Sequence, residues 1–393
     1  MEVGSALNLR VLEIADGVSG PYCGRILAGY GARVVKVEAP VGKGHDITRD
    51  EVPFKDDVPG PDRSGLFAYL NANKLGITLD WSSQAGASIL QRLVEQQDLV
   101  ILSGPDRLSH ELLETWNPAV VSLTVSPYGE TGPYKDYLAS ELTMQALGGI
   151  MGRTGLPESE PLVSGALLSQ FIAGANALSV GLAAVFRARK SGRGCHIDLS
   201  TFEAVVQFLQ GTMMKWSFEQ TVVRRGAQSR AANAIYPCKD GYVGIFAPGS
   251  GTAWRNVAEV MEEPRLADAR FKTRALRSEH VDELDALILP WTLEHTKEDI
   301  YHRSQAADLP FGPVRTSAAV MASAHHRERG FVRTTEHPVL GKYESPGMPF
   351  RISSLEWRDR PAPSQGEHSA EVFRDDLQLT ADGLDPLRAA EVI

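Results

Sequence analysis

A regular alternation of apolar runs and amphipathic segments over residues 10–126 constrains the fold of this chain more than any other feature. The runs with the character of buried strands are residues 10–15, 32–39, 98–103 and 119–126. Segments with helical spacing of apolar residues separate them, at residues 20–31 and 83–97. Strands that alternate with helices at this spacing predict an α/β fold, a parallel sheet with helices on both faces.

The turn after the first run reads ADGVSGPYCG and does not contain GxGxxG. The order of elements therefore indicates a Rossmann-like domain without NAD chemistry. Such a turn can still direct backbone amides toward a phosphate at a helix start, which makes Val18 and Ser19 candidate ligand contacts.

Residues 161–200 are predicted to form one long helix rich in small residues, followed by a glycine-rich turn and a short strand. Gln170 lies near the start of this helix. Its amide can hold a ligand, but an amide is a weak nucleophile because its nitrogen lone pair is delocalised.

The sequence as a whole predicts a chain of four parts. They are a large Rossmann-like domain at 1–200, a helical linker at 201–232, a smaller α+β domain at 233–344, and a segment at 345–393 that returns to the large domain. The smaller domain is expected to open with a hairpin in CKDGYVGIF, with Asp240-Gly241 as the turn.

Charge and composition exclude several classes of function. The net charge of −9 gives no basic surface for nucleic acid, and no GxSxG or CxxC motif indicates a serine hydrolase or a metal site. The start of the chain does not resemble a leader peptide, and no run approaches the roughly 18 apolar residues of a membrane span. We therefore expect a cytoplasmic protein.

The segment SPYGETGPY, residues 126–134, directly follows a strand and predicts a shaped loop at the ligand-binding edge of the sheet. Glu141 comes soon after this loop. It is either a carboxylate that faces a site or a first-turn residue that stabilises a helix N-terminus.

At this point the sequence resembles a known family. VLEIADGVSGPYCGRILAGYGARVVKVEAP, NANKLGITLD, SPYGETGPY and RKSGRGCHIDLSTFEAV, in this order, are similar to the class III CoA-transferases, which include formyl-CoA transferase, carnitine CoA-transferase and α-methylacyl-CoA racemase. The match continues to GEHSAEVF, so it covers nearly the whole chain. The resemblance implies a Rossmann-like domain, a smaller domain and two interlocked chains. Gly174, Ala177 and Gly181 would permit the close helix approach that interlocking needs.

The resemblance does not extend to the catalytic group. In the transferases, an aspartate at the position of Gln170 attacks the thioester, and the racemases add a histidine that aligns near Ser140. A carboxylate can attack and later leave, whereas an amide cannot, so this covalent route should be lost. Glu141 matches an acidic residue of the transferase site and is the only carboxylate that this alignment leaves there.

Other positions bear on binding. Asn71, Asn73 and Lys74 agree with a family segment near CoA, or they form only a turn before a strand. Arg107 is a candidate phosphate contact. We expect no permanently bound cofactor or metal, and CoA or an acyl-CoA as the substrate.

Three hypotheses remain. The chain is the subunit without a nucleophile in a heteromeric CoA-transferase similar to benzylsuccinate CoA-transferase, with a homologue that carries the aspartate as its partner, and it is inactive alone. Alternatively, it is a homomeric acyl-CoA enzyme, such as a thioester hydrolase or a lyase, that uses Glu141 or bound water. The third possibility is a CoA-ester binding protein without turnover.

Overall fold

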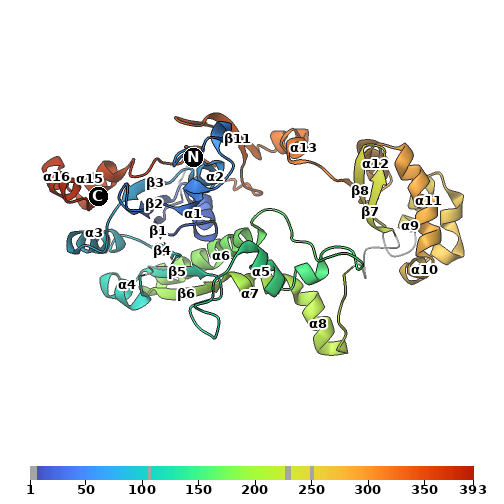
Figure 1. Cartoon of the computed structure of the whole chain (residues 1–393), viewed down its shortest axis with the longest axis horizontal. Coiled ribbons are helices and arrows are strands. Elements are labelled where there is room, and N and C mark those ends of the chain that lie inside the picture. The colour runs from blue at the N-terminus through green and yellow to red at the C-terminus, as the bar shows by residue number, and fades with distance from the viewer. Residues whose placement is uncertain (1–6, 105–107, 226–231, 248–251) are drawn as a thin grey trace. The chain divides into compact units, whose positions relative to one another are not determined.

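The computed structural model describes residues 7–104, 108–225, 232–247 and 252–393 (Figure 1). The chain divides into two compact units. Unit 1 contains residues 1–150, 163–210 and 327–393, and unit 2 contains residues 151–162 and 211–326.

Unit 1 is built on a six-stranded sheet in which every strand pairs with its neighbours in parallel. The strands are β1 (Arg10–Ile14), β2 (Arg33–Glu38), β3 (Leu75–Thr78), β4 (Leu99–Leu102), β5 (Val121–Ser126) and β6 (Cys195–Ser200). Their spatial order is β3-β2-β1-β4-β5-β6. This is the strand order of Rossmann folds, and it confirms the predicted α/β class.

Helices cover both faces of this sheet, as the strand and helix alternation predicted. Alternate strand residues separate the two cores: Leu12 and Val100 belong to one, and Val11 and Leu99 to the other. The first core includes α3 (Gln84–Val94), α4 (His110–Trp116), α15 (Ser369–Leu377) and α16 (Ala381–Ala389). The second includes α1 (Ser19–Gly29), α6 (Leu168–Ser191) and α7 (Thr201–Val206).

The long helix α6 lies directly against α1 and the sheet. A Cβ atom on Gly174 would lie 2.6 Å from the carbonyl oxygen of Ser19, and one on Gly181 would lie 3.3 Å from Leu123. The small residues of α6 thus serve close packing within this chain. By length and composition alone α6 could cross a membrane, but a core helix of a folded domain passes the same test, and Ala173 and Ala177 are fully buried here.

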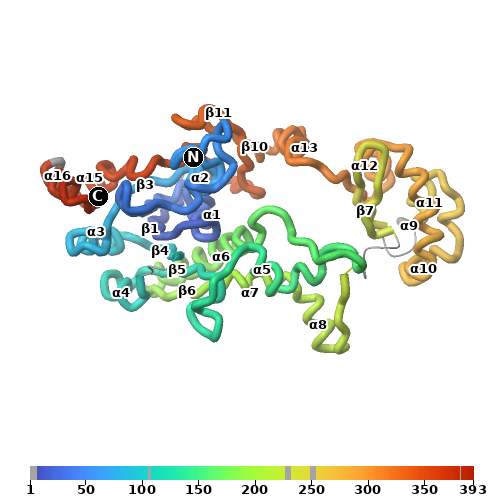
Figure 2. Tube along the Cα trace, in the orientation of Figure 1, coloured from blue at the N-terminus to red at the C-terminus, as the bar shows by residue number. Residues whose placement is uncertain are grey.

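The remaining elements of unit 1 surround the sheet. They are η1 (Ile47–Asp50), η2 (Lys55–Asp57), α2 (Gly65–Asn71), α5 (Glu141–Leu147), η4 (Gln207–Leu209), and the antiparallel hairpin β10 (Val332–His337) and β11 (Gly341–Pro346). The C-terminal segment runs back along the domain to α15, which contacts β3 and α3 (Figure 2).

Unit 2 has a separate core around a small antiparallel sheet, β7 (Asn233–Cys238), β8 (Gly241–Phe246) and β9 (Gly312–Pro313). Its helices are η3 (Met151–Arg153), α9 (Thr252–Val260), η5 (Pro264–Ala267), η6 (Ala269–Phe271), α10 (Arg274–Glu279), α11 (Val281–Glu294), α12 (Lys297–Ala306), α13 (Ser317–Met321) and α14 (Ala324–Glu328). Helix α8 (Gln210–Glu219) begins where the chain passes from unit 1 to unit 2.

Several boundaries differ from those expected. The long helix begins at Leu168, not near residue 161. Within the helical linker expected at 201–232, η4 separates α7 from α8, which ends at Glu219. The hairpin exists, but Cys238 pairs with Gly241, so its turn residues are Lys239 and Asp240. The strands β10 and β11 belong to unit 1 and not to the smaller unit. A reason is visible in the contact of Arg25 on α1 with the carbonyl oxygen of Pro346, at 3.4 Å.

A buried cluster of charged side chains links β1, β2 and the loop after β2. Lys36 Nζ lies 2.6 Å from Asp46 Oδ2 and 3.3 Å from Glu13 Oε1, and all three side chains are buried. Although burial opposes a positive charge, Asp46 and then Glu13 hold the pKa of Lys36 above its ordinary value. A buried ion pair of this kind fixes geometry, since losing either partner leaves an uncompensated charge.

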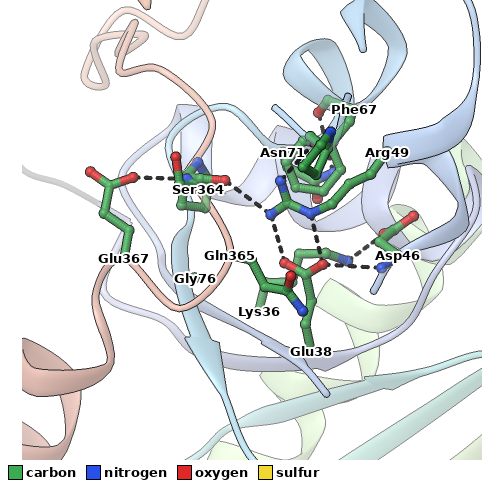
Figure 3. A network of polar contacts seen from close by, with 12 residues as sticks. Lys36, Glu38, Asp46, Arg49, Phe67, Asn71, Gly76, Ser364, Gln365 and Glu367 are labelled. Carbon is green, nitrogen blue, oxygen red and sulfur yellow. Dashed lines mark hydrogen bonds and ion pairs between the residues drawn. The ribbon is translucent and has the colours of Figure 1, made fainter. Parts of the chain in front are cut away.

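Arg49 pairs with Glu38 beside this cluster and also reaches the C-terminal segment (Figure 3). The buried Arg49 guanidinium donates two hydrogen bonds to Glu38, at 2.8 and 2.9 Å, and a third to the carbonyl oxygen of Pro363, at 3.1 Å. The backbone N–H of Asp46 also donates to Glu38, at 3.0 Å. The loop after β2 is therefore held in one conformation between the sheet and residues 363–367.

Candidate functional site

A cavity of about 340 Å³ lies at the carboxyl edge of the parallel sheet, within unit 1. Residues 16–20, 103–104 and 125–127, which follow or end the strands β1, β4 and β5, form much of its wall. Ligand sites of open α/β sheets occur at this edge, because the loops after the strands are brought together there. The cavity is completed by Ser140, Glu141 and Gln170 from the starts of α5 and α6.

Gln170 occupies the first turn of α6 and is partly buried. Its side chain reaches toward the β1–α1 turn, since a Cβ atom on Gly17 would lie 3.9 Å from Gln170 Oε1. Gly17 has φ of +74°, a conformation that residues with a side chain rarely adopt. The turn after β1 thus passes close to the Gln170 amide without a side chain between them.

Glu141 also lines the cavity, and its carboxylate is engaged. Glu141 Oε1 accepts hydrogen bonds from the backbone N–H of Ser169 and from Gln145 Nε2, each at 2.8 Å. Leu167, the residue before α6, provides no side-chain cap, so Glu141 satisfies one of the free N–H groups at the start of α6. Of the two interpretations of Glu141, the structure therefore shows a contact with a helix N-terminus, that of α6, in addition to exposure to the cavity.

Ser140, near which the histidine of the racemases aligns, caps its own helix. Its hydroxyl accepts from the backbone N–H of Thr143, at 3.2 Å, and the Thr143 side chain accepts from the backbone N–H of Ser140, at 2.8 Å. This reciprocal pair is a capping box, which fixes the start of α5 and therefore the position of Glu141.

Asp16 is a second carboxylate of this cavity that the sequence reasoning missed. Its backbone N–H donates to Ser103 Oγ at 3.1 Å, and the Ser103 hydroxyl donates to the Asp16 carbonyl at 3.0 Å, which ties the end of β1 to the end of β4. Burial, and next the negative charge of Asp46, raise the pKa of the Asp16 carboxyl above its usual value. Both Asp16 and Ser103 stand just after strands, a position that marks candidate site residues in parallel sheets.

Val18 and Ser19 line the cavity at the start of α1 and are buried. No side chain caps this helix start. The candidate contact Arg107 lies outside the residues that the structure describes.

The other three candidate contacts, Asn71, Asn73 and Lys74, form hydrogen bonds within the protein. Lys74 Nζ is buried and donates to Glu13, Asn71 and the carbonyl oxygen of Pro21, at 2.7 to 2.9 Å. Burial lowers the pKa of Lys74 to about 8, despite the attraction of Glu13. Asn73 is bonded to the backbone of residues 358 and 360, at 3.0 and 2.7 Å. In this arrangement the Lys74 ammonium is not accessible to a phosphate, and a contact of these residues with CoA stays a prediction.

A smaller cavity of about 220 Å³ adjoins the first one and shares Asp16, Ser103 and Gly104 with it. Its other walls include His45 and Trp81, together with Glu38 and Asp46. These last two carboxylates are already paired with Arg49 and Lys36, as described above. The two cavities form a site with room for an elongated ligand along the carboxyl edge of the sheet.

Comparisons with known proteins agree with this architecture. The family described as CoA-transferase family III matches residues 7–369. A succinyl-CoA–D-citramalate CoA-transferase from Chloroflexus aurantiacus is 31% identical, over 98% of this chain and 97% of that protein. A protein named succinyl-CoA:(R)-benzylsuccinate CoA-transferase subunit BbsE, from Thauera aromatica, is 29% identical over 93% of each chain.

Among solved structures, a CAIB/BAIF family protein from Brucella suis has a TM-score of 0.83 at 27% identity, and the match covers 95% of this chain and all of that chain. The similarity thus extends over the whole fold, both units included. The resemblance inferred from the motifs is confirmed, and the chain belongs to CoA-transferase family III.

Proposed function

We propose that this chain is the subunit without a nucleophile in an enzyme that transfers CoA between carboxylic acids. Its partner is a homologous subunit that carries the catalytic aspartate. The observation that carries the proposal is the Gln170 amide in the cavity at the start of α6, where the family pattern has that aspartate.

The chemistry of the side chain supports this role. Attack on a thioester carbonyl forms an acyl anhydride and releases the CoA thiolate, and only a group that later leaves as a stable anion can complete the exchange. An amide does neither. The Gln170 NH₂ group can instead donate hydrogen bonds to a carbonyl or carboxylate oxygen, at a helix N-terminus that favours negative charge.

Two further features support a partner and a CoA substrate. A relative of this chain is named as one subunit of a CoA-transferase. Helix α6 carries exposed apolar side chains, including Leu182 and Phe186, of which 37% and 64% of the surface is accessible. Leu182 and Phe186 are four residues apart and so lie on one face of the helix, and exposed apolar side chains grouped on one face are typical of protein interfaces. The two adjoining cavities would hold the thioester end and an adjacent part of the CoA chain.

Co-expression with a family member from the same genome that carries the aspartate tests the proposal. We expect a stable complex that exchanges CoA between succinyl-CoA and a second carboxylate, while this chain alone shows no exchange. Replacing the aspartate of the partner by asparagine should abolish exchange. Full exchange by the isolated chain, with a protein-bound thioester that hydroxylamine cleaves, would refute the proposal.

Asp16 favours a second candidate, a homomeric enzyme that hydrolyses an acyl-CoA. A partly buried carboxyl with a raised pKa is suited to activating water, because a stronger base accepts a proton more readily. Under this alternative the isolated chain releases free CoA from an acyl-CoA, and Asp16→Asn lowers kcat by roughly 100-fold or more. Absence of thioester hydrolysis by the wild-type chain excludes it.

A further inference from the structure

A third and larger cavity, of about 710 Å³, is also lined by residues at the start of α6. Its walls come from the loop at residues 52–55, from α2, from the start of α6 and from β11, all within unit 1. The lining is predominantly apolar and includes four aromatic rings, those of Phe54, Tyr69, Phe171 and Tyr343. Cavities of this size and character are typical of small-molecule sites.

Contacts behind the cavity hold its aromatic walls in place. The Phe171 ring packs edge to face on Tyr22, with centroids 4.8 Å apart, and also contacts Tyr69. The buried Arg25 guanidinium lies 4.1 Å from the centroid of the Tyr69 ring. Such contacts orient rings and favour a preformed pocket over one that collapses.

The rim of the cavity carries more positive than negative charge. Its cations are Lys55, Arg63 and Lys342, and its acidic residue, Glu344, is paired with Arg327 at 2.8 Å. Lys55 and Arg63 each lie 3.4 Å from the Asp56 carboxylate, which offsets one positive charge. The Arg63 guanidinium donates to the carbonyl oxygens of Val58 and Lys55, at 3.0 and 2.7 Å. The rim therefore complements a single anionic group on a ligand whose body is apolar.

The helix geometry places this cavity beside the candidate site. Leu167, the residue before α6, accepts a backbone hydrogen bond from the N–H of Phe171 at 3.0 Å, and both residues line the large cavity. Gln170 precedes Phe171 by one residue and lines the 340 Å³ cavity of the candidate site, on the adjacent face of the helix. The start of α6 thus forms a wall of both spaces.

We propose that the large cavity binds the apolar body of a carboxylic acid substrate, an aryl- or branched alkyl-substituted carboxylate. The proposal rests on the function proposed above and names the class of acid that this chain selects. Short dicarboxylates such as succinate would leave most of this apolar lining unfilled.

Binding of phenylbutyrate and of butyrate, measured by calorimetry on the full chain, tests the proposal, because the two acids differ only in the phenyl ring. We expect phenylbutyrate to bind roughly tenfold or more tightly than butyrate, since the ring buries apolar surface. Leu66→Trp, which fills the cavity from α2, should weaken phenylbutyrate roughly tenfold. Lys342→Glu should weaken both acids by a factor of about five.

Matched controls are available on exposed positions of unit 2. Leu293→Trp and Lys272→Glu make the same chemical changes away from the cavity and should leave binding unchanged. If Leu66→Trp does not fold, Ser345→Phe on β11 fills the same cavity from the opposite wall and replaces it.

The outcomes separate this proposal from the proposed function. The cavity assignment is overturned if the two acids bind equally, or if neither cavity-filling variant weakens the binding of phenylbutyrate. It is also overturned if a second copy of the chain occupies the cavity. Calorimetry with CoA on the same samples tests the function independently. Loss of CoA binding with retained phenylbutyrate binding would refute the CoA-transferase role and keep the carboxylate site.

Discussion

The Glu141 carboxylate accepts a hydrogen bond from the backbone N–H of Ser169 at 2.8 Å and so fixes the first turn of the helix that carries Gln170. A carboxylate at this position satisfies a free N–H group and interacts favourably with the helix dipole. Glu141 therefore positions the turn of α6 from which the Gln170 amide faces the cavity.

Removal of this contact should loosen the start of α6. We expect Glu141→Ala to lower the free energy of unfolding by about 1 to 3 kcal/mol, since it removes a partly buried acceptor and leaves the Ser169 N–H unpaired. Denaturant unfolding measures the loss, and hydrogen exchange of the amides at 168–171 locates it. Glu158→Ala, an exposed acidic position of unit 2, is the control. Unchanged exchange at 168–171 would contradict the role of Glu141.

Placing a carboxylate at position 170 tests whether the cavity at the start of α6 supports the covalent chemistry expected from the family pattern. In Gln170→Asp, the new carboxylate faces the same cavity, and we expect an acyl-CoA to produce a covalent protein adduct that hydroxylamine cleaves. Gln170→Ala should give none. Mass spectrometry of the intact protein after incubation with succinyl-CoA detects the adduct. A Gln170→Asp protein that binds CoA yet forms no adduct would show that the rest of the site has also diverged.

A substitution of Lys74 tests whether this residue stabilises the fold or contacts the ligand. Lys74→Met removes one cation from the buried cluster with Glu13 and should cost about 3 to 5 kcal/mol of unfolding free energy. Because the ammonium is enclosed, the folded variant should bind CoA as the wild type does. Lys43→Met changes a partly exposed lysine and is the control for stability. A large loss of CoA affinity without loss of stability would instead support the ligand contact first expected for Lys74.

Most of the sheet could be predicted because the strand signals are local, whereas the short helices α2 and α4 were not predicted. β1, β2, β4 and β5 are short apolar runs between turn residues, and the burial of Leu12 on one face and Val11 on the other follows from strand geometry. The start of α6 was misplaced because residues 161–167 are mostly small or apolar and match a helix by composition. Their backbone is held elsewhere, for example by the hydrogen bond from the Ser164 N–H to Gln145.

The roles of charged residues could not be read from the sequence alone. Lys74 looks like a surface cation before a strand, but Glu13 lies 61 positions away in sequence and only the fold brings it within 2.7 Å. Asp16 was predictable in principle, since it stands two residues after the end of β1, at the ligand-binding edge of the sheet. The family pattern directed attention to Glu141 and Gln170 and away from it.

The acid stability of the protein should depend on the ion pair between Glu38 and Arg49. Although burial opposes ionisation of Glu38, the Arg49 hydrogen bonds and then the charge of Lys36 lower its pKa below the ordinary value of 4.5. A lowered pKa contributes stability that is present above pH 4.5 and lost as the pH falls below that value toward the folded pKa.

We therefore expect Glu38→Gln to lower the free energy of unfolding at pH 7 by about 3 kcal/mol, because Arg49 loses its buried partner. The difference from the wild type should shrink as the pH falls below 4.5, where protonation removes the same charge from the wild-type protein. Urea unfolding at several pH values measures both effects. Asp375→Asn, at an exposed carboxylate, should show little effect at either pH. A Glu38→Gln difference that stays constant across this range would mean that Glu38 does not titrate with folding.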